Sequence, residues 1–242
     1  MAAKDGIEVF VLAAPGREAI TAACRASLEA SDIGQAYRWC EHPADLDKLG
    51  HWSATFGAMA ASEAPQVLLL EDDCLVNAHI LQNIRLWSWP DHHEFGAGWL
   101  YNPGAYCAGH DVWYSGPPDW YGTVAVLYWR EDVALIHALA LDWMRRQNSL
   151  AWDCAVSHAV HYLNRKIRVH GPPLVEHQHE APSLLGHTHS WAYGSTRGTY
   201  QPNWVAGISA VRDDHTRLDR RTPQAVPPKR TMRAQGPLPE LG

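Results

Sequence analysis

The chain has 242 residues, of which 46% are hydrophobic, enough to bury a substantial core in one α/β domain or in one domain with a tail. No window approaches the roughly 18 apolar residues of a membrane span, and the N-terminus lacks a basic region followed by a long apolar stretch, so we expect a cytoplasmic protein without a membrane span. The five cysteines form no C-x-x-C pair and are odd in number, which argues against a disulfide framework and a cysteine-built zinc site.

The positive charge of the chain gathers at its C-terminal end. Residues 212–242 carry seven Lys/Arg against four Asp/Glu, although the whole chain has a formal net charge of −6. This segment also holds five prolines and few large apolar side chains, which predicts an extended or poorly ordered tail. We therefore expect a domain over residues 1–211 and a tail over residues 212–242, either solvated or in contact with a phosphate-bearing acceptor.

The first seventy residues alternate between strand-like and helix-like patterns. In chain order they predict a strand over Ile7–Leu12, a helix over Glu18–Ala30, a strand over Tyr37–Cys40, a helix over Trp52–Ser62 and a strand over Val67–Leu70. This β-α-β-α-β order predicts an α/β fold with a mostly parallel central sheet flanked by helices and right-handed crossovers. Because the opening lacks G-x-G-x-x-G, it does not favour a dinucleotide oxidoreductase.

The rest of the chain continues the alternation after one long interruption. We predict a helix over Ala78–Trp87, a loop over 90–121, a strand over Thr123–Tyr128, helices over Asp132–Arg146 and Ala151–Leu163, and short strands over Ile167–Val169 and Leu174–His177.

Three adjacent acids follow the third predicted strand. Glu71, Asp72 and Asp73 come directly after the apolar run Val67–Leu70, at the carboxyl end where α/β sheets bind ligands. Like charges this close raise one another's pKa unless a cation lies among them, so we interpret the cluster as a metal site rather than an acidic turn. At a strand end reached by solvent, Asp73→Ala is expected to abolish metal-dependent ligand binding with little loss of stability.

Four motifs in this order resemble one family of enzymes. They are the Pro15-Gly16-Arg17 loop after the first strand, Gly50-His51-Trp52-Ser53 before a helix, Leu70-Glu71-Asp72-Asp73 as a form of the metal-binding D-x-D motif, and Pro173-Leu174-Val175-Glu176-His177 with Ser183 following. Over about residues 7–190 the chain is similar to nucleotide-sugar glycosyltransferases of GT-A fold, within them glycosyltransferase family 25, the lipopolysaccharide-biosynthesis type.

The resemblance implies a site for a nucleotide-sugar donor, a UDP-sugar foremost, with Mn²⁺ or Mg²⁺ bridging its diphosphate. Asp73 is expected to bind the metal, Glu71 or Asp72 to complete its shell or contact the ribose, and His177 to reach the same ion. Pro15 and Arg17, just after the first strand, are expected near the donor. The histidines at 177, 179, 187 and 189 could alternatively hold a zinc ion by themselves.

An inverting transferase needs a base for the acceptor hydroxyl. Asp153, near the start of a predicted helix, is our candidate, against the alternative of an ordinary first-turn acid, with Asp119 and Asp111 in reserve. A retaining enzyme would not need such a base, and neither the stereochemistry nor the oligomeric state follows from the sequence.

Aromatic residues fill the predicted loop. Trp113, Trp120 and Tyr121 lie in a segment rich in glycine and proline, and flat aromatic faces stack on sugars and on bases, so we expect residues 96–121 to face the acceptor. That acceptor could be a glycan or a lipid-linked glycan, or a hydroxylated base in DNA of the phage type. Other classes remain open: a metal-dependent phosphoesterase or nuclease could use the same acids, and a non-catalytic carbohydrate-binding module would explain the aromatics but not the acids.

Overall fold

The computed structural model describes residues 6–43, 45–87, 95–101, 112–114, 123–178, 200–207 and 216–217. Its helices are α1 (Glu18–Ala30), α2 (Lys48–Ala60), α3 (Ile80–Leu86), α4 (Arg130–Gln147) and α5 (Trp152–Tyr162). The strands are β1 (Ile7–Leu12), β2 (Tyr37–Cys40), β3 (Gln66–Glu71), β4 (Cys74–Val76), β5 (Phe95–Trp99), β6 (Val112–Tyr114), β7 (Ala125–Trp129), β8 (Lys166–Val169), β9 (Val175–His177) and β10 (Thr216–Arg217).

Eight of the strands form one sheet, in the order β10-β6-β8-β5-β7-β3-β1-β2. The N-terminal part is parallel, because β1 pairs in parallel with both β2 and β3. Strand β7 then runs antiparallel to its neighbours β3 and β5. Four of the seven pairings in this sheet are parallel, and the predicted α/β fold with a central sheet and flanking helices is confirmed.

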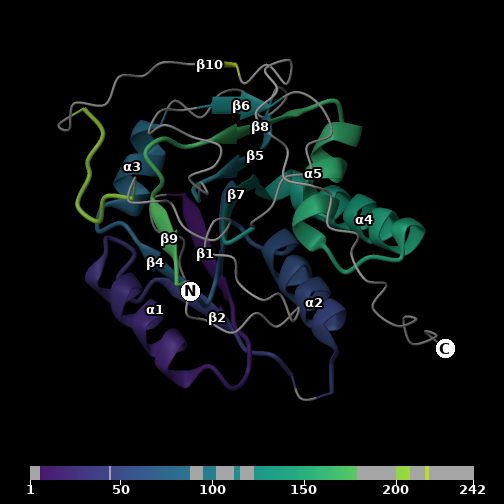
Figure 1. The fold of residues 1–242 in the computed structure, drawn as a ribbon, viewed down its shortest axis with the longest axis horizontal. Helices are drawn as coiled ribbons and strands as arrows, with labels where there is room; N and C mark the ends of the chain where they lie inside the picture. Colours follow the sequence, from purple (N-terminus) through teal and green to yellow (C-terminus); the bar gives the residue numbers. More distant parts are fainter. Residues whose placement is uncertain are drawn as a thin grey trace, which may run out of the picture.

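Helices cover both faces of the sheet (Figure 1). Strand β3 has four consecutive apolar residues, so alternate side chains enter opposite layers. Val67 and Leu69 pack in the layer formed with α2, α4 and α5, whereas Leu68 and Leu70 pack in the layer formed with α1 and α3. With both faces buried, the strand is held firmly, and its last residues have a fixed position at the sheet edge.

The predicted loop over 90–121 is wrong in part, because it contains β5 and β6. Strand β5 lies inside the sheet between β7 and β8. Its Gly96 resembles a loop residue in the sequence, but a Cβ at this position would come within 3.0 Å of the Val160 side chain of α5. The glycine therefore permits close packing of a helix on a strand, a role that local sequence does not distinguish from a turn.

Strands β4 and β9 form a separate antiparallel pair beside α1 (Figure 1). A buried polar network supports this pair: Asn77 donates its backbone N–H to Leu174 O at 2.8 Å and its side-chain amide to Gln201 O at 2.7 Å. Asn83 of α3 donates to Trp204 O at 2.9 Å and accepts from Ala206 N at 2.9 Å. Residues 200–207 are thus bound to α3 and to the end of β4.

Replacing Asn83 with Ala is expected to lower the free energy of unfolding by roughly 3 kcal/mol, because several buried hydrogen bonds disappear and the Ala206 N–H loses its acceptor. Urea denaturation measures this, with Leu86→Ala, an exposed position on the same helix, as the control expected to stay near wild type. Equal stability of the two variants would contradict the structural role of this network.

Two residues of the predicted tail, Thr216 and Arg217, form β10 and pair with β6. The division into 1–211 and 212–242 stays a prediction. In the described part of the chain, the helices are all too short or too polar to cross a membrane.

Candidate active site

The three acids lie where β3 ends and the chain turns toward β4. Strands β1 and β3 pair in register from Ile7↔Gln66 to Leu12↔Glu71, so their carboxyl ends meet at the same edge of the sheet. The Asp72 backbone N–H donates to Leu12 O at 3.2 Å. The loop from β1 to α1, which carries Arg17, therefore lies directly beside the acids.

Asp72 is almost wholly buried and both its carboxylate oxygens are occupied. Its Oδ1 accepts from Arg17 Nη2 at 2.9 Å, and its Oδ2 accepts from the Ala14 backbone N–H at 2.9 Å. Burial raises the pKa of Asp72 to about 6, although the Ala14 and Arg17 bonds act in the opposite direction. Asp72 therefore ties the β1–α1 loop to the end of β3.

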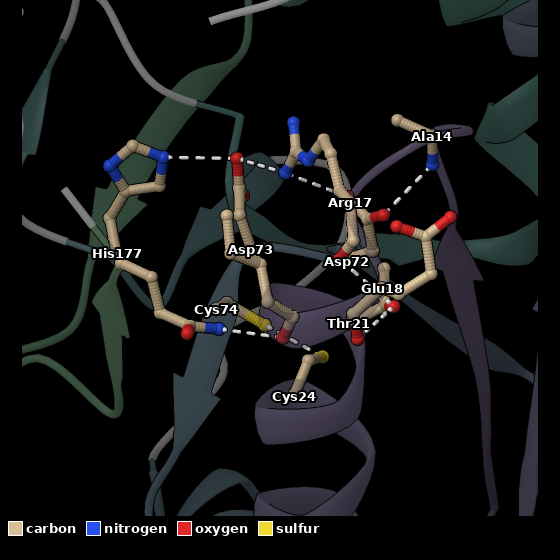
Figure 2. A network of polar contacts seen from close by, with 11 residues as sticks. Ala14, Arg17, Glu18, Thr21, Cys24, Asp72, Asp73, Cys74 and His177 are labelled. Carbon is tan, nitrogen blue, oxygen red and sulfur yellow. Dashed lines mark hydrogen bonds and ion pairs between the residues drawn. The ribbon is translucent and has the colours of Figure 1, made fainter. Parts of the chain in front are cut away.

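Asp73 lies between a guanidinium and an imidazole (Figure 2). Its Oδ2 is 2.6 Å from Arg17 Nη2 and 3.2 Å from His177 Nε2. Burial acts to raise the pKa of Asp73, but the contacts with His177 and Arg17 outweigh it and hold the pKa below its ordinary value. The carboxylate is thus kept ionised in a buried position.

The exposure of Asp73 corrects one prediction from the sequence. The residue is only 6% exposed, not at a solvent-reached strand end, because β9 and the β1–α1 loop cover it. Removing its side chain would leave Arg17 with one buried partner instead of two, so Asp73→Ala is expected to cost stability as well. Its other oxygen, Oδ1, is buried and has no hydrogen-bond partner among the described residues.

Strand pairing brings His177 to this position from a hundred residues away. It is the last residue of β9 and pairs with Cys74, the residue after Asp73. The next residue, Gln178, donates its backbone N–H to Asp73 O at 2.7 Å and its side-chain amide to Ile20 O of α1 at 3.2 Å. The pairing of His177 with Cys74 and the bond from Gln178 N–H to Asp73 O therefore hold the imidazole against the Asp73 carboxylate.

Glu71 is the last residue of β3. Its Oε1 accepts from Thr123 Oγ1 at 3.1 Å. Burial and the neighbouring Asp73 raise its pKa to about 7, His177 lowers it, and Asp153 raises it further. The charge of Asp153 thus lies within electrostatic reach of Glu71. Asp153 itself is in the first turn of α5 and accepts from the Cys154 N–H through Oδ1 at 2.8 Å.

A pH-dependent stability follows from Glu71. Its carboxyl binds a proton more tightly in the folded protein, with a pKa of about 7, than at the ordinary value of 4.5, so the folded state loses relative stability as pH rises between these values. We expect Glu71→Gln, measured in EDTA, to melt above wild type at pH 8 and to lose this advantage near pH 5. A difference that stays constant across this pH range would contradict the raised pKa.

The donor set suits a divalent cation held by few protein ligands. Within the described ranges, no group of three or more His, Cys, Asp and Glu side chains has the arrangement of a complete metal site. Asp73 nevertheless presents one buried oxygen, Oδ1, without a hydrogen bond, while its other oxygen, Oδ2, contacts the His177 imidazole. One carboxylate and one imidazole fit a Mn²⁺-type ion whose remaining ligands come from phosphate and water.

The predicted site residues fall into two groups. Glu71, Asp72, Asp73, His177 and Arg17 lie together, with Asp153 within electrostatic reach. Pro15, in the β1–α1 loop with Arg17, is exposed and precedes Gly16, whose φ is positive. The others lie outside the described residues: Asp111, Asp119, Trp120, Tyr121, Ser183 and the histidines at 179, 187 and 189, whereas Trp113 belongs to β6 with only its backbone described.

Some contacts escape sequence reasoning. The Arg17 guanidinium binds the two aspartates, and its expected place near the donor stays a prediction. The backbone N–H groups of Ala14 and Gln178 also bind the acids. Backbone groups are the same in every residue, so the sequence does not indicate these bonds. One signal in the sequence could have predicted that Arg17 lies beside the acids. Pro15-Gly16 soon after the first strand indicates a turn that brings the chain back over the strand ends.

No family model and no curated protein matches the chain. Among solved structures, it is similar to a glycosyltransferase involved in the glycosylation of the major capsid of PBCV-1, with 12% identity, a TM-score of 0.44, and coverage of 72% of this chain and 93% of that one. It is also similar to the galactosyltransferase LgtC in complex with donor and acceptor sugar analogues, with 12% identity, a TM-score of 0.43, and coverage of 79% and 93%.

A third similar structure is the apo form of the glycosyltransferase GlyE of Streptococcus pneumoniae TIGR4, with 10% identity, a TM-score of 0.43, and coverage of 66% of this chain and 44% of that one. All three are glycosyltransferases. We infer the activity from the geometry of the site rather than from these likenesses.

Proposed function

We propose that the protein is a glycosyltransferase of GT-A type that moves a sugar from a nucleotide-sugar donor to an acceptor hydroxyl with the help of a divalent cation. The observation that carries this proposal is the buried Asp73 carboxylate, which has one oxygen beside His177 Nε2 and the other without a hydrogen-bond partner in the described structure. The pair lies at the carboxyl edge of a central sheet, where α/β proteins bind nucleotides.

Asp73 and His177 would hold the cation, which we propose to be Mn²⁺ or Mg²⁺. A bound divalent ion neutralises the charge that develops on a diphosphate leaving group. Glu71 would be a further ligand. A divalent cation nearby would lower the raised pKa of Glu71, and the ionised carboxylate could then join the metal shell. Asp72 is a poorer ligand, since Arg17 and Ala14 already occupy both its oxygens.

The acceptor side of the reaction needs a base that can take a proton from a hydroxyl. Asp153 is our candidate for this base, and its carboxylate lies within electrostatic reach of Glu71. Asp153 lies in the first turn of α5, a helix packed into the core through Ala155, Val156 and Ala159, which would keep it in place. We therefore propose an inverting reaction with Asp153 as general base.

The donor that we propose is a UDP-sugar and the acceptor a glycan hydroxyl. A hydroxylated base in DNA is the other acceptor to test, and the basic residues 212–242 motivate it. Two-metal phosphoester hydrolysis is less compatible with the site, because it needs carboxylates that bridge two ions, and Arg17 already binds both Asp72 and Asp73.

The products distinguish these reactions. The protein is incubated with UDP-, GDP- and CMP-linked sugars, with Mn²⁺ or EDTA, together with glycan acceptors or hydroxymethylated DNA, and the nucleotides are separated by chromatography. A transferase cleaves the bond to the anomeric carbon and releases UDP or GDP from diphosphate donors. A phosphoesterase would cleave within the diphosphate and release the nucleoside monophosphate with a sugar phosphate, and this result would overturn the proposal.

A further inference from the structure

A single arginine contacts both aspartates of the acid cluster. The side chains of Arg17, Asp72 and Asp73 are 6%, 3% and 8% exposed, so water screens none of them effectively. One nitrogen of the guanidinium, Nη2, lies 2.9 Å from Asp72 Oδ1 and 2.6 Å from Asp73 Oδ2 (Figure 2). Two buried carboxylates therefore share one guanidinium, which cannot be deprotonated in proteins, and Asp73 Oδ2 also contacts His177 Nε2 at 3.2 Å.

The backbone around Arg17 fixes this arrangement. Gly16 has φ of +73°, a conformation that side-chain-bearing residues rarely adopt, and it turns the chain back over the strand ends. Arg17 is then the N-cap residue of α1, and its carbonyl accepts from the N–H groups of Ile20 and Thr21 at 3.0 and 2.9 Å. The Arg17 backbone is thus fixed at the start of α1, with its side chain beside the acids.

Two ionised carboxylates without a counter-charge would be costly in this environment, since burying an unpaired charge is strongly destabilising. Both oxygens of Asp72 have a partner, since Arg17 donates to Oδ1 and the Ala14 N–H donates to Oδ2. Arg17 contacts Asp73 on Oδ2 only, which leaves Oδ1 unbound in the described structure. Arg17 and His177 therefore both engage Oδ2, and Oδ1 is the oxygen that stays available.

We propose that Arg17 is a positioning residue: a built-in counter-cation that pairs with Asp72 and Asp73, orients both carboxylates, and presents Asp73 Oδ1 to the divalent ion. The part that concerns the ion rests on the proposed function, whereas the part that concerns the two aspartates does not. Arg17 brings one positive charge to the two carboxylates that it contacts, Asp72 and Asp73. The negative charge that remains on these three side chains attracts the divalent cation.

The test measures melting temperatures in EDTA and in Mn²⁺ for wild type, Arg17→Met, Arg17→Lys, and the double variant Arg17→Met with Asp72→Asn. In EDTA, Arg17→Met is expected to melt about 10 °C below wild type, because two buried carboxylates lose the guanidinium and keep only the Ala14 N–H and His177 as partners. Arg17→Lys restores part of the loss because it restores the charge. The double variant recovers at least half of the loss, since it removes one of these two carboxylates.

Mn²⁺ supplies the readout that a packing role would not move. Arg17→Met makes the cluster more negative, so Mn²⁺ is expected to raise its melting temperature by more than it raises that of wild type, while the double variant responds like wild type. Arg38→Met is the control: Arg38 Nη2 lies 2.6 Å from Glu8 Oε1, and Glu8 is near the amino end of β1, whereas the acids lie at its carboxyl end, so the loss of Arg38 should not change the Mn²⁺ response.

The outcomes separate the two proposals. A double variant as unstable as Arg17→Met, or a Mn²⁺ response of Arg17→Met no larger than that of wild type when wild type does respond, overturns the counter-cation role. If Mn²⁺ shifts neither protein, the proposed cation site fails, and the recovery of the double variant in EDTA still decides the role of Arg17. If Arg17→Met alone is insoluble, a folded double variant supports the proposal and an insoluble one contradicts it.

Discussion

Replacing Asp153 with Asn is expected to lower kcat by about 10²–10⁴-fold, the usual contribution of a general base, while leaving the affinity for the nucleotide sugar close to wild type. The amide keeps the shape of the side chain and can still accept the Cys154 N–H, so α5 should begin as before. It cannot take the proton of the acceptor hydroxyl. Steady-state transfer kinetics with saturating donor, together with donor titration, measure both quantities.

The control for this variant is Asp142→Asn, an exposed acid on α4 whose partner Arg146 lies one helical turn away. It should retain wild-type kinetics. If Asp153→Asn keeps kcat within about threefold of wild type, less than general-base catalysis supplies, Asp153 is not the base and a retaining reaction becomes the better account.

Replacing Asp73 with Asn is expected to weaken Mn²⁺-dependent binding of the nucleotide sugar by about 100-fold or more, since the lost group is a direct ligand and even supporting residues of metal sites contribute 10–100-fold. Asparagine is nearly isosteric and its amide oxygen can still accept from Arg17 or His177, so the fold should persist with a moderate loss of stability. Calorimetric titration of donor in Mn²⁺ and in EDTA gives the difference.

Asp72→Asn is the matched comparison, one residue away and equally buried. Both oxygens of Asp72 are engaged by Arg17 and Ala14, so this variant should change stability rather than Mn²⁺-dependent binding, with less than about a tenfold loss of donor affinity, at the lower limit for a supporting residue. Equal losses of affinity in the two variants would contradict the assignment of Asp73 as the ligand.

The strand that carries the acids was open to sequence reasoning because its signal is local. Four apolar residues in a row indicate burial on both faces, and three acids immediately after them mark the strand end. The elements β1, α1 and β2 likewise begin and end at the predicted residues. Such elements can be predicted because their periodicity and their boundaries depend on neighbouring residues only.

Long-range contacts were less accessible. Strand β4 is three residues long and follows the acids directly, and its existence depends on pairing with β9, a hundred residues later. That pairing also sets His177 against Asp73, which the resemblance implied and periodicity could not. The association of Arg17 with both aspartates depends on the Gly16 turn and on the packing of α1. The spacing of charged residues in the sequence predicts neither of them.

The most direct measurement is a calorimetric titration of UDP-, GDP- and CMP-linked sugars into the wild-type protein, once with Mn²⁺ and once with EDTA. We expect one nucleotide sugar to bind in Mn²⁺, its binding to be lost in EDTA, and Asp73→Asn to abolish the difference between the two conditions. Binding of the same affinity with and without the cation, or no binding of any nucleotide sugar, would contradict a metal-dependent donor site built on Asp73 and His177.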